Sequence, residues 1–231
     1  MPKEIPGMEF AGTMPPLVSG SRAGRWATNA AGIVGGGSYA EQLTIHERLL
    51  LPIPGGVALD DAAAIPEVFL TAFDALVVQG GLTAGRIALV HAGASGVGTA
   101  SIQIAKAMGA AIIVTCSTGK VQACLDLGAD VVVDYTATKL VDAVETVTSG
   151  VGVDVILDVI GGEYTIDNIK SIKTKGRIIQ VGVMGDQKVE LPLGMLLAKR
   201  CVYHRDNPSG LSVGREGGTG AALQSRANPA V

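Results

Sequence analysis

A glycine turn between a strand and a helix is the segment whose residue types point most directly to chemistry. The apolar run that ends at His91 is followed by the turn and then by an amphipathic stretch typical of a helix. A turn without Cβ atoms lets backbone N–H groups approach a pyrophosphate, and the new helix presents unpaired N–H groups and the positive end of its dipole. The segment therefore predicts a dinucleotide site rather than a plain connection, and its residues are Gly93, Ala94, Ser95, Gly96, Val97 and Gly98.

The match of this turn to the GxGxxG pattern is imperfect, because Ser95 stands where the second glycine would be. Gly96 still permits close approach of the backbone, and the Ser95 hydroxyl is expected to add a hydrogen-bond donor. Gly98 is expected to let the helix pack closely against the strand.

The end of the second strand bears on which dinucleotide is bound. An NAD site usually carries an acidic residue there for the ribose 2′-hydroxyl, but no acidic residue occurs from Ala92 to Leu125. Ser117 and Lys120 instead offer a hydroxyl and a positive charge, which suit a 2′-phosphate. The sequence thus favours NADP(H) over NAD(H); the alternative for Lys120, taken alone, is a solvated residue of a first helical turn.

Neither a metal site nor a familiar catalytic pair emerges from the other polar residues. The cysteines and histidines show no ligand spacing; they are Cys116, Cys124, Cys201, His46, His91 and His204. Tyr135 and Lys139 fit the YxxxK pair of short-chain dehydrogenases, yet Tyr135 directly follows the third strand, whereas that pair belongs on a helix after the fourth. We assign no metal ligand and leave the catalytic residues unknown.

The elements that must hold these residues alternate regularly between positions 61 and 200. Apolar runs predict strands at Ile87–His91, Ala111–Thr115, Val131–Asp134, Val153–Val159 and Arg177–Val181. Helices are predicted near Gly98–Met108, Lys120–Leu127, Lys139–Thr148 and Tyr164–Ile172, with an earlier one from Asp60 or Asp61 to about Val78. Apolar strands separated by helices predict an α/β fold with a doubly wound parallel (Rossmann) sheet.

The two ends of the chain lack this regularity. Residues 1–60 are irregular apart from a short apolar stretch at Met8–Ala11 and a strand-like stretch at Tyr39–Ile45. Residues 201–231 contain scattered glycines without a helical or strand period, so we expect a poorly ordered tail there. The expected domains are therefore 1–60, 61–200 and 201–231.

Composition excludes several classes of protein. The chain has 231 residues with 48% hydrophobic and 17% charged residues, which does not fit an intrinsically disordered protein. Its formal net charge is −3, without a basic patch for nucleic acid or a long apolar span for a membrane. The odd cysteine count without a CxxC motif, and the absence of an apolar leader run, favour the cytoplasm.

Six segments together resemble one family. They are GGGSYAEQLTIHERLLLPIPGG, AAAIPEVFLTAFDALVVQGGLTAG, LVHAGASGVGTASIQIAKAMGA, LGADVVVDY, GVDVILDVIGGEY and GRIIQVGVMG. Over about residues 32–200 the chain is similar to the zinc-independent quinone oxidoreductase branch of the medium-chain dehydrogenase/reductase superfamily. The resemblance implies a partial GroES-like β region before an NADP-binding Rossmann domain.

The resemblance also implies roles for individual residues. Ala94 to Gly98 fall on the pyrophosphate loop, and Ser117 and Lys120 fall where the 2′-phosphate is held. Tyr135 matches a tyrosine beside the adenosine phosphate. The positions that border the nicotinamide half are Thr71, Gly161, Gly182, Val183 and Met184, although Thr71 could equally be a helix-surface hydroxyl.

The activity implied is NADPH-dependent reduction of a quinone or a similar electrophilic enone. Two alternatives stay open: an enoyl or alkenal reductase with the same cofactor site, or an NADP-binding fragment without turnover. The family's early GroES-like strands and its sixth Rossmann strand are not found in the pattern, so the chain is expected to be truncated at both ends. The homodimer usual in the family is doubtful for that reason.

Overall fold

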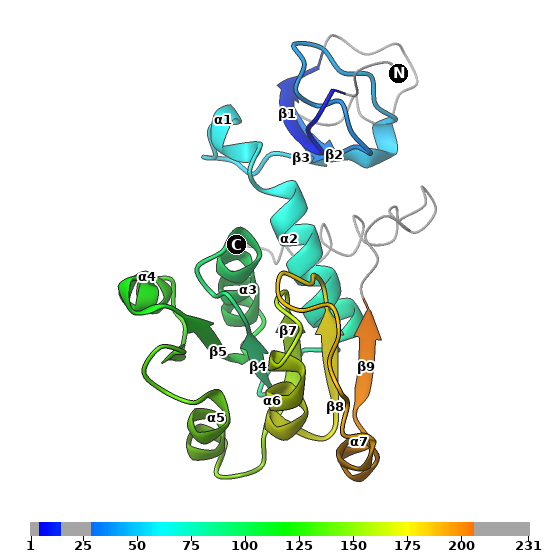
Figure 1. The fold of residues 1–231 in the computed structure, drawn as a ribbon. Helices are drawn as coiled ribbons and strands as arrows, with labels where there is room; N and C mark the ends of the chain where they lie inside the picture. The colour runs from blue at the N-terminus through cyan, green and yellow to red at the C-terminus, as the bar shows by residue number, and fades with distance from the viewer. Residues whose placement is uncertain (1–4, 15–28, 206–231) are drawn as a thin grey trace. The chain divides into compact units, whose positions relative to one another are not determined.

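The computed structural model describes residues 5–14 and 29–205, which form two compact units. The first unit runs up to Leu70 and the second begins at Thr71 (Figure 1). Each unit is built from one sheet.

The first unit holds a small antiparallel sheet in the order β1-β2-β3, formed by β1 (Glu9–Thr13), β2 (Asn29–Ile33) and β3 (Leu50–Pro52). Phe10 pairs with Gly32, and a Cβ atom at Gly32 would lie 2.9 Å from the Phe10 ring. This sheet fits the GroES-like remnant expected from the sequence. The strand expected at Tyr39–Ile45 is wrong, because those residues form bends and irregular backbone.

The helix expected from Asp60 to Val78 is interrupted. The structure has α1 (Leu59–Ala62), α2 (Pro66–Phe73) and a π-helical segment η3 (Asp74–Gln79). The break falls at Pro66, whose ring disfavours a helical residue before it but suits the first position of a new helix. Neither aspartate caps α1, because the N-cap residue is Ala58.

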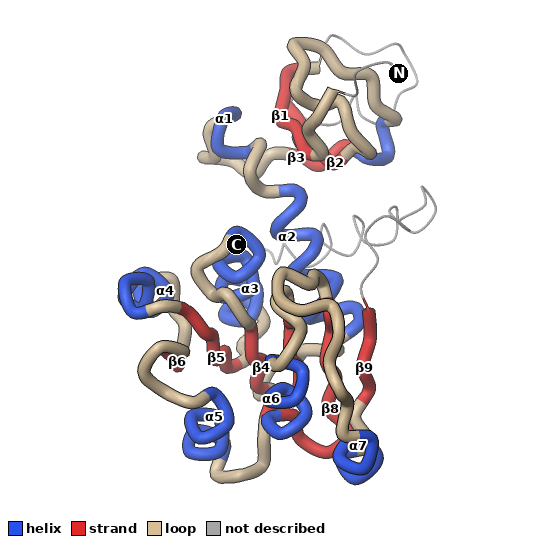
Figure 2. The backbone as a smooth tube through the Cα atoms, viewed as in Figure 1, coloured by secondary structure: helices blue, strands red, loops and turns tan. Residues whose placement is uncertain are grey.

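The second unit is a six-stranded parallel sheet in the order β6-β5-β4-β7-β8-β9 (Figures 1 and 2). Its strands are β4 (Ile87–Val90), β5 (Ala111–Cys116), β6 (Val131–Asp134), β7 (Val153–Asp158), β8 (Ile172–Gln180) and β9 (Val202–Arg205). The helices between them are α3 (Gly96–Ala107), α4 (Val121–Asp126), α5 (Leu140–Thr148), α6 (Tyr164–Ser171) and α7 (Leu193–Lys199). The predicted doubly wound fold is confirmed.

Both faces of the central part of this sheet are covered, which explains why β4, β5 and β7 are mostly apolar and buried. Ile156 on β7 belongs to a core cluster with Val144 of α5 and Ile169 of α6. Val155 points to the opposite face because side chains alternate along a strand. There it lies 2.6 Å from the Cβ position of Gly80, just after η3.

The sixth strand corrects the sequence prediction. Residues 202–205 were expected to belong to an unpatterned tail, but they form β9, which pairs in parallel with β8. Four residues are too few to show a period, and the unpaired edge of β8 supplies the hydrogen bonds that hold them in a strand. The sequence argument against a dimer assumed that the sixth strand was missing, so that argument no longer applies. Residues 206–231, the rest of the predicted tail, lie outside the described residues.

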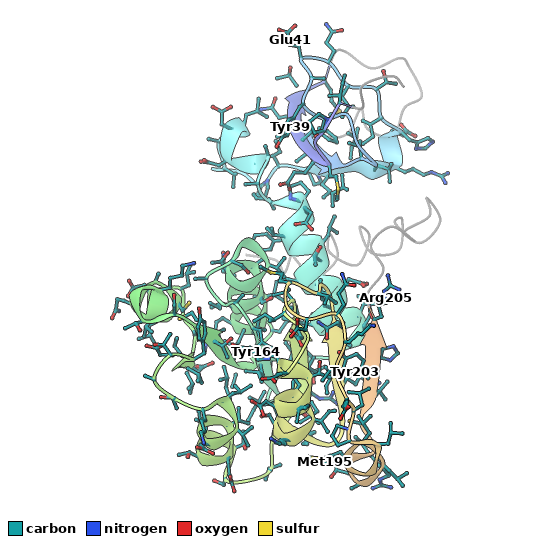
Figure 3. All side chains as sticks on the ribbon, in the orientation of Figure 1. Tyr39, Glu41, Tyr164, Met195, Tyr203 and Arg205 are labelled. Atoms are coloured by element: carbon teal, nitrogen blue, oxygen red, sulfur yellow. The ribbon has the colours of Figure 1, made fainter. Side chains whose placement is uncertain are left out.

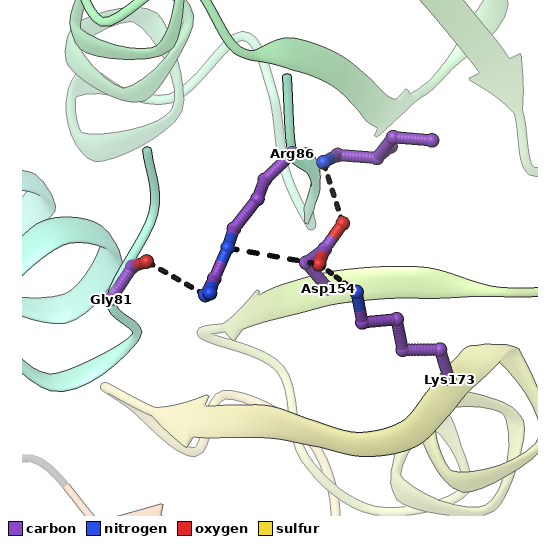
Figure 4. A network of polar contacts seen from close by, with 5 residues as sticks. Gly81, Arg86, Asp154 and Lys173 are labelled. Carbon is purple, nitrogen blue, oxygen red and sulfur yellow. Dashed lines mark hydrogen bonds and ion pairs between the residues drawn. The ribbon is translucent and has the colours of Figure 1, made fainter. Parts of the chain in front are cut away.

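Aspartate carboxylates join neighbouring strands at the amino edge of the sheet, and Figure 4 shows the contacts of one of them, Asp154. Asp154 at the start of β7 accepts a hydrogen bond from Ile87 N–H of β4 at 2.9 Å and pairs with Lys173 and Arg86. Asp130 repeats the pattern, accepting from Ile112 N–H of β5 at 2.8 Å. These contacts join neighbouring strands, so this edge of the sheet has a structural role.

Candidate functional site

The opposite, carboxyl edge of the sheet carries the predicted cofactor residues. The chain winds from β4 outward to β6 and then restarts at β7 on the other side of β4. In open α/β sheets the crevice at such a reversal is where ligands bind. The turns after β4 and β7 border it.

The turn after β4 forms the start of α3 as predicted. Ser95 is the N-cap residue, and its Oγ accepts a hydrogen bond from Gly98 N–H at 3.1 Å. The sequence suggested Ser95 only as a donor to a ligand, whereas the structure uses its oxygen to begin the helix. The first N–H groups of any helix have no acceptor inside it. In α3 these are the N–H groups of Gly96 and Val97, on the exposed or half-buried rim of the turn.

Two glycines of this turn have no room for a side chain. A Cβ atom at Gly98 would lie 2.3 Å from the Ala92 carbonyl oxygen, and one at Gly93 would lie 2.5 Å from Val114 Cβ. Ala92 itself has a φ of 54°, a left-handed conformation that is uncommon outside glycine. The backbone is thus held tightly where a pyrophosphate would approach, which is the fit that the pattern requires.

The turn after β5 brings Ser117 and Lys120 together. Ser117 precedes a short 3-10 helix, η4 (Thr118–Lys120), and its carbonyl accepts the Lys120 N–H at 2.9 Å. The turn lies beside the glycine turn, because Gly93 N–H donates to Thr115 O at 2.8 Å. Among the ion pairs that the described residues form, none involves Lys120, whose side chain is exposed.

Asp134 is a neighbour of this turn that sequence reasoning missed. It pairs with Cys116 in the register of β5 and β6. Hydrogen bonds from the Thr118 and Thr136 hydroxyls lower the pKa of the Asp134 carboxyl, and Thr136 Oγ1 lies 2.7 Å from Oδ1. No local pattern along β5 indicates Asp134, because it lies on β6 and reaches this turn only through the parallel pairing of the two strands. Tyr135, the next residue, is 51% exposed at this edge.

The turn after β7 meets the loop after β8, as the nicotinamide-side prediction requires. Gly161 has a φ of 71°, and its Cβ position would lie 3.3 Å from Val183. Met184 N–H donates to Val159 O at 3.2 Å, and Gly182 N–H to Asp158 O at 3.4 Å. Val183 and Met184 expose 52% and 80% of their surfaces. Four of the five residues assigned to this half are thus adjacent, while Thr71 lies half-buried on α2.

A buried chain of polar side chains, also missed by the sequence, joins these turns. His91 Nδ1 lies 3.1 Å from Thr115 Oγ1, and His91 Nε2 lies 2.7 Å from Asn168 Oδ1. Asn168 Nδ2 donates to Asp158 Oδ2 at 2.9 Å. We call Thr115, His91, Asn168 and Asp158 the strand-end network. All four are buried, and burial lowers the pKa of His91 despite the raising influence of Asp158 and of Asn168.

Further polar contacts continue along the same edge to the last strand. Gln180 Nε2 donates to Asp158 O at 3.2 Å and to Gly182 O at 2.5 Å. Tyr203 on β9 (Figure 3) donates its hydroxyl to Gln180 Oε1. The carboxyl ends of β5, β4, β7 and β8 are therefore linked in their spatial order, and Tyr203 within β9 extends the series.

The described residues offer neither a metal cluster nor a membrane-spanning helix. Within residues 5–14 and 29–205, no group of three or more histidine, cysteine or acidic side chains is placed to hold a metal ion. No helix in that part of the chain is long and apolar enough to span a membrane.

Comparison with known proteins identifies related chains. Residues 96–205 match the family described as Zinc-binding dehydrogenase. Quinone oxidoreductase-like protein 2 of Rattus norvegicus is 31% identical over 196 residues, which cover 84% of this chain and 56% of that protein. The chain thus spans a little over half the length of this relative.

Solved structures share the fold. The quinone oxidoreductase of Thermus thermophilus, described together with its NADPH complex, has a TM-score of 0.79 and 28% identity, covering 98% of this chain and 68% of that one. The JamJ enoyl reductase has a TM-score of 0.78 and 23% identity, covering 95% of this chain and 66% of that one, and shows the fold alone.

Proposed function

This chain belongs to the medium-chain dehydrogenase/reductase superfamily and is similar to its quinone oxidoreductase-like members, and from that premise we propose that it binds NADP(H) and transfers a hydride to a quinone or similar electrophilic carbonyl. The observation that carries the proposal is the glycine turn. Gly93 and Gly98 leave no room for a Cβ atom, and Ser95 starts a helix of 12 residues directly at the turn.

The cofactor would be held at three places along the carboxyl edge. The turn from Gly93 to Gly98 would bind the pyrophosphate through backbone N–H groups and the positive end of the α3 dipole. Ser117, Lys120 and Tyr135 would hold the phosphorylated adenosine half. Gly161, Gly182, Val183 and Met184 would border the nicotinamide, with Thr71 as a further candidate.

A 2′-phosphate is favoured over a free ribose hydroxyl by the exposed ammonium of Lys120 and the hydroxyl of Ser117 in one turn. Asp134 acts in the opposite sense, because its carboxylate would repel a phosphate and accept from a hydroxyl. The Lys120 ammonium belongs to the turn after β5, while the Asp134 carboxylate already accepts hydrogen bonds from the Thr118 and Thr136 hydroxyls. We therefore retain NADP(H).

When bound, the reduced cofactor supplies the hydride. The chain's own contribution is to position the two reactants and to exclude water from between them. Val183 and Met184 offer an apolar border where the substrate ring would lie. No residue is assigned as a catalytic acid.

Reduction of enoyl or alkenal substrates is the alternative, because the same cofactor site would serve that reaction equally well. A panel of quinones assayed beside α,β-unsaturated carbonyls separates the two. Preference for the enones by orders of magnitude would replace the quinone assignment.

Binding must be measured separately from turnover. We expect a saturable NADPH fluorescence change with the purified chain, and its absence would overturn the cofactor assignment. Tight binding with no reduction of any acceptor would favour a cofactor-binding chain without turnover.

The three cysteines are free thiols, two of them buried, which supports a reducing compartment such as the cytoplasm.

A further inference from the structure

We propose that His91 and Asn168 are positioning residues: through the strand-end network they fix the turn that would border the nicotinamide relative to the turn that would bind the pyrophosphate. The inference rests on the proposed function, since it assigns those two turns to the two halves of one cofactor. It concerns side chains that do not touch the cofactor.

The direction of every hydrogen bond in the network follows from its carboxylate end. Asp158 only accepts, so the Asn168 amide nitrogen must face it at 2.9 Å. The Asn168 oxygen then faces His91 at 2.7 Å and requires a proton on Nε2. A neutral His91 therefore accepts at Nδ1, and the Thr115 hydroxyl is its donor at 3.1 Å. One tautomer of His91 is selected.

One end of the network reaches the glycine turn. Thr115 Oγ1, which donates to His91, also faces the N–H of Ala92 at 3.3 Å. Ala92 holds the left-handed backbone conformation that precedes Gly93, and its carbonyl is the group that crowds Gly98. The Thr115 hydroxyl thus helps to fix the residue on which the shape of the turn depends.

The other end reaches the turn after β7. Asp158 Oδ1 accepts from the N–H groups of Ile160 at 2.6 Å and of Gly161 at 3.0 Å. Gly161 needs a positive φ, and it contacts the loop that carries Val183. A shift of the Asp158 carboxylate would therefore move the backbone that borders the nicotinamide site.

The surroundings of His91 keep the chain of hydrogen bonds in one protonation state. His91 is completely buried, with Asp158 and Asp167 as the charged groups that influence it. The ring of Tyr164 lies edge-on to it, with ring centroids 4.9 Å apart. Burial outweighs the two carboxylates, so His91 stays neutral and keeps its accepting Nδ1.

The test compares two ligands on the full chain: NADPH, and 2′-phospho-ADP-ribose, which has the same phosphates but no nicotinamide. The variant is Asn168→Asp, which keeps the size of the side chain but turns the donor toward Asp158 into an acceptor. We expect NADPH affinity to fall about tenfold or more above neutral pH, the usual effect of losing a hydrogen bond to a charged group, with the fragment nearly unaffected.

The pH dependence separates positioning from general damage. At low pH a proton shared by the two carboxylates of Asn168→Asp restores a donor, so the ratio of the two affinities should recover below about pH 6. Both ligands carry the same 2′-phosphate, so the titration of that group cancels in the ratio. Equal losses for both ligands at every pH would overturn the proposal.

A second variant and a matched control cover the case in which Asn168→Asp does not fold. Thr115→Val removes one hydroxyl of the network, while Thr148→Val removes a buried hydroxyl that also makes two hydrogen bonds, to Val144 O and from Gly152 N–H, at the amino edge. Thr115→Val should weaken both ligands, and NADPH more. Thr148→Val should lower the melting temperature without changing the ratio, and the same ratio in both variants would contradict the proposal.

Failure of the proposed function gives a different result. If the unaltered chain binds neither ligand, the cofactor assignment fails, and the proposal falls with it. If the unaltered chain binds both ligands and only the variants' ratios are unchanged, the network is structural and the cofactor assignment stands.

Discussion

Gly98 on α3 and Ala92 in the turn before it are so close that a Cβ atom at Gly98 would lie 2.3 Å from the Ala92 carbonyl oxygen. We expect Gly98→Ala to lower the free energy of unfolding by about 1–3 kcal/mol, the usual cost of forcing a methyl group into a filled space. NADPH binding should weaken as well, because the turn would have to open. Thermal unfolding and a fluorescence titration measure the two effects.

Gly194 on α7 supplies the matched control for that substitution. It lies in a helix, nothing is found within 4 Å of its Cβ position, and its φ is not positive. Gly194→Ala should raise stability by about 0.5–1 kcal/mol through helix propensity and leave NADPH binding unchanged. Equal behaviour of the two variants would show that the Gly98 site is not crowded.

Lys120→Ala tests the choice of cofactor. Loss of the ammonium should weaken NADPH by about 1–3 kcal/mol, the range for a hydrogen bond to a charged group, and NADH much less. Isothermal titration with both cofactors measures the difference. Equal losses would mean that Lys120 does not contact a 2′-phosphate.

Asp134→Asn tests the opposing charge. The amide keeps an oxygen for Thr136 N–H, which donates to Asp134 Oδ1 at 2.9 Å, but removes the negative charge beside the β5 turn. We expect the preference for NADPH over NADH to rise, and the gain to shrink as salt is added, because the group is exposed. A preference that stays constant at low salt would remove Asp134 from the cofactor site.

His91 predicts how stability depends on pH. Burial lowers its pKa in the folded chain below the ordinary value of 6.5, so the unfolded chain binds more protons under acidic conditions. Stability should therefore be complete above about pH 6.5 and decline below it, with a slope of up to about 1.4 kcal/mol per pH unit until the folded-state pKa is reached.

Chemical denaturation at a series of pH values measures that slope. His91→Gln should flatten the dependence just below about pH 6.5, because glutamine binds no proton there. A slope that survives His91→Gln would assign the effect to another group.

Substitution of Asp154 should lower the stability of the fold without weakening cofactor binding. Asp154→Ala leaves Ile87 N–H without its acceptor and Lys173 without its partner at the amino edge. We expect a loss of up to about 1–3 kcal/mol in unfolding free energy, because a partly buried donor loses its acceptor, and an unchanged NADPH affinity in the folded fraction. A matching loss of affinity would contradict the separation of the two edges.

Local sequence patterns were enough to predict the parallel sheet and its helices, because strands buried on both faces read as continuous apolar runs. They were not enough for β9, whose four residues depend on the edge of β8 for their pairing. The break between α1 and α2 was predictable from Pro66, because proline favours the start of a helix over its interior. The helical spacing of the apolar residues on both sides instead suggested one continuous helix.

Those parts of the candidate site whose residues are consecutive in the sequence, such as the glycine turn, were predictable from the sequence. Asp134 and the strand-end network were not, because their contacts join residues far apart in the chain, up to 77 positions between His91 and Asn168. Local sequence indicates His91 only as the last residue of the predicted strand Ile87–His91. Its role depends on Asn168, which only the packing of α6 brings to it.

The amino-edge carboxylates also bear on how such a protein could change over evolutionary time. Asp154 and Asp130 join neighbouring strands at the amino edge, whereas Thr118 of the turn after β5 makes its side-chain hydrogen bonds at the opposite edge, with Thr136 and Asp134. Replacing the turn after β5 with one of another composition would leave the hydrogen bonds of Asp154 and Asp130 to neighbouring strands intact. If this turn selects the dinucleotide as proposed, that selectivity could change without loss of the contacts that hold the strands together at the amino edge.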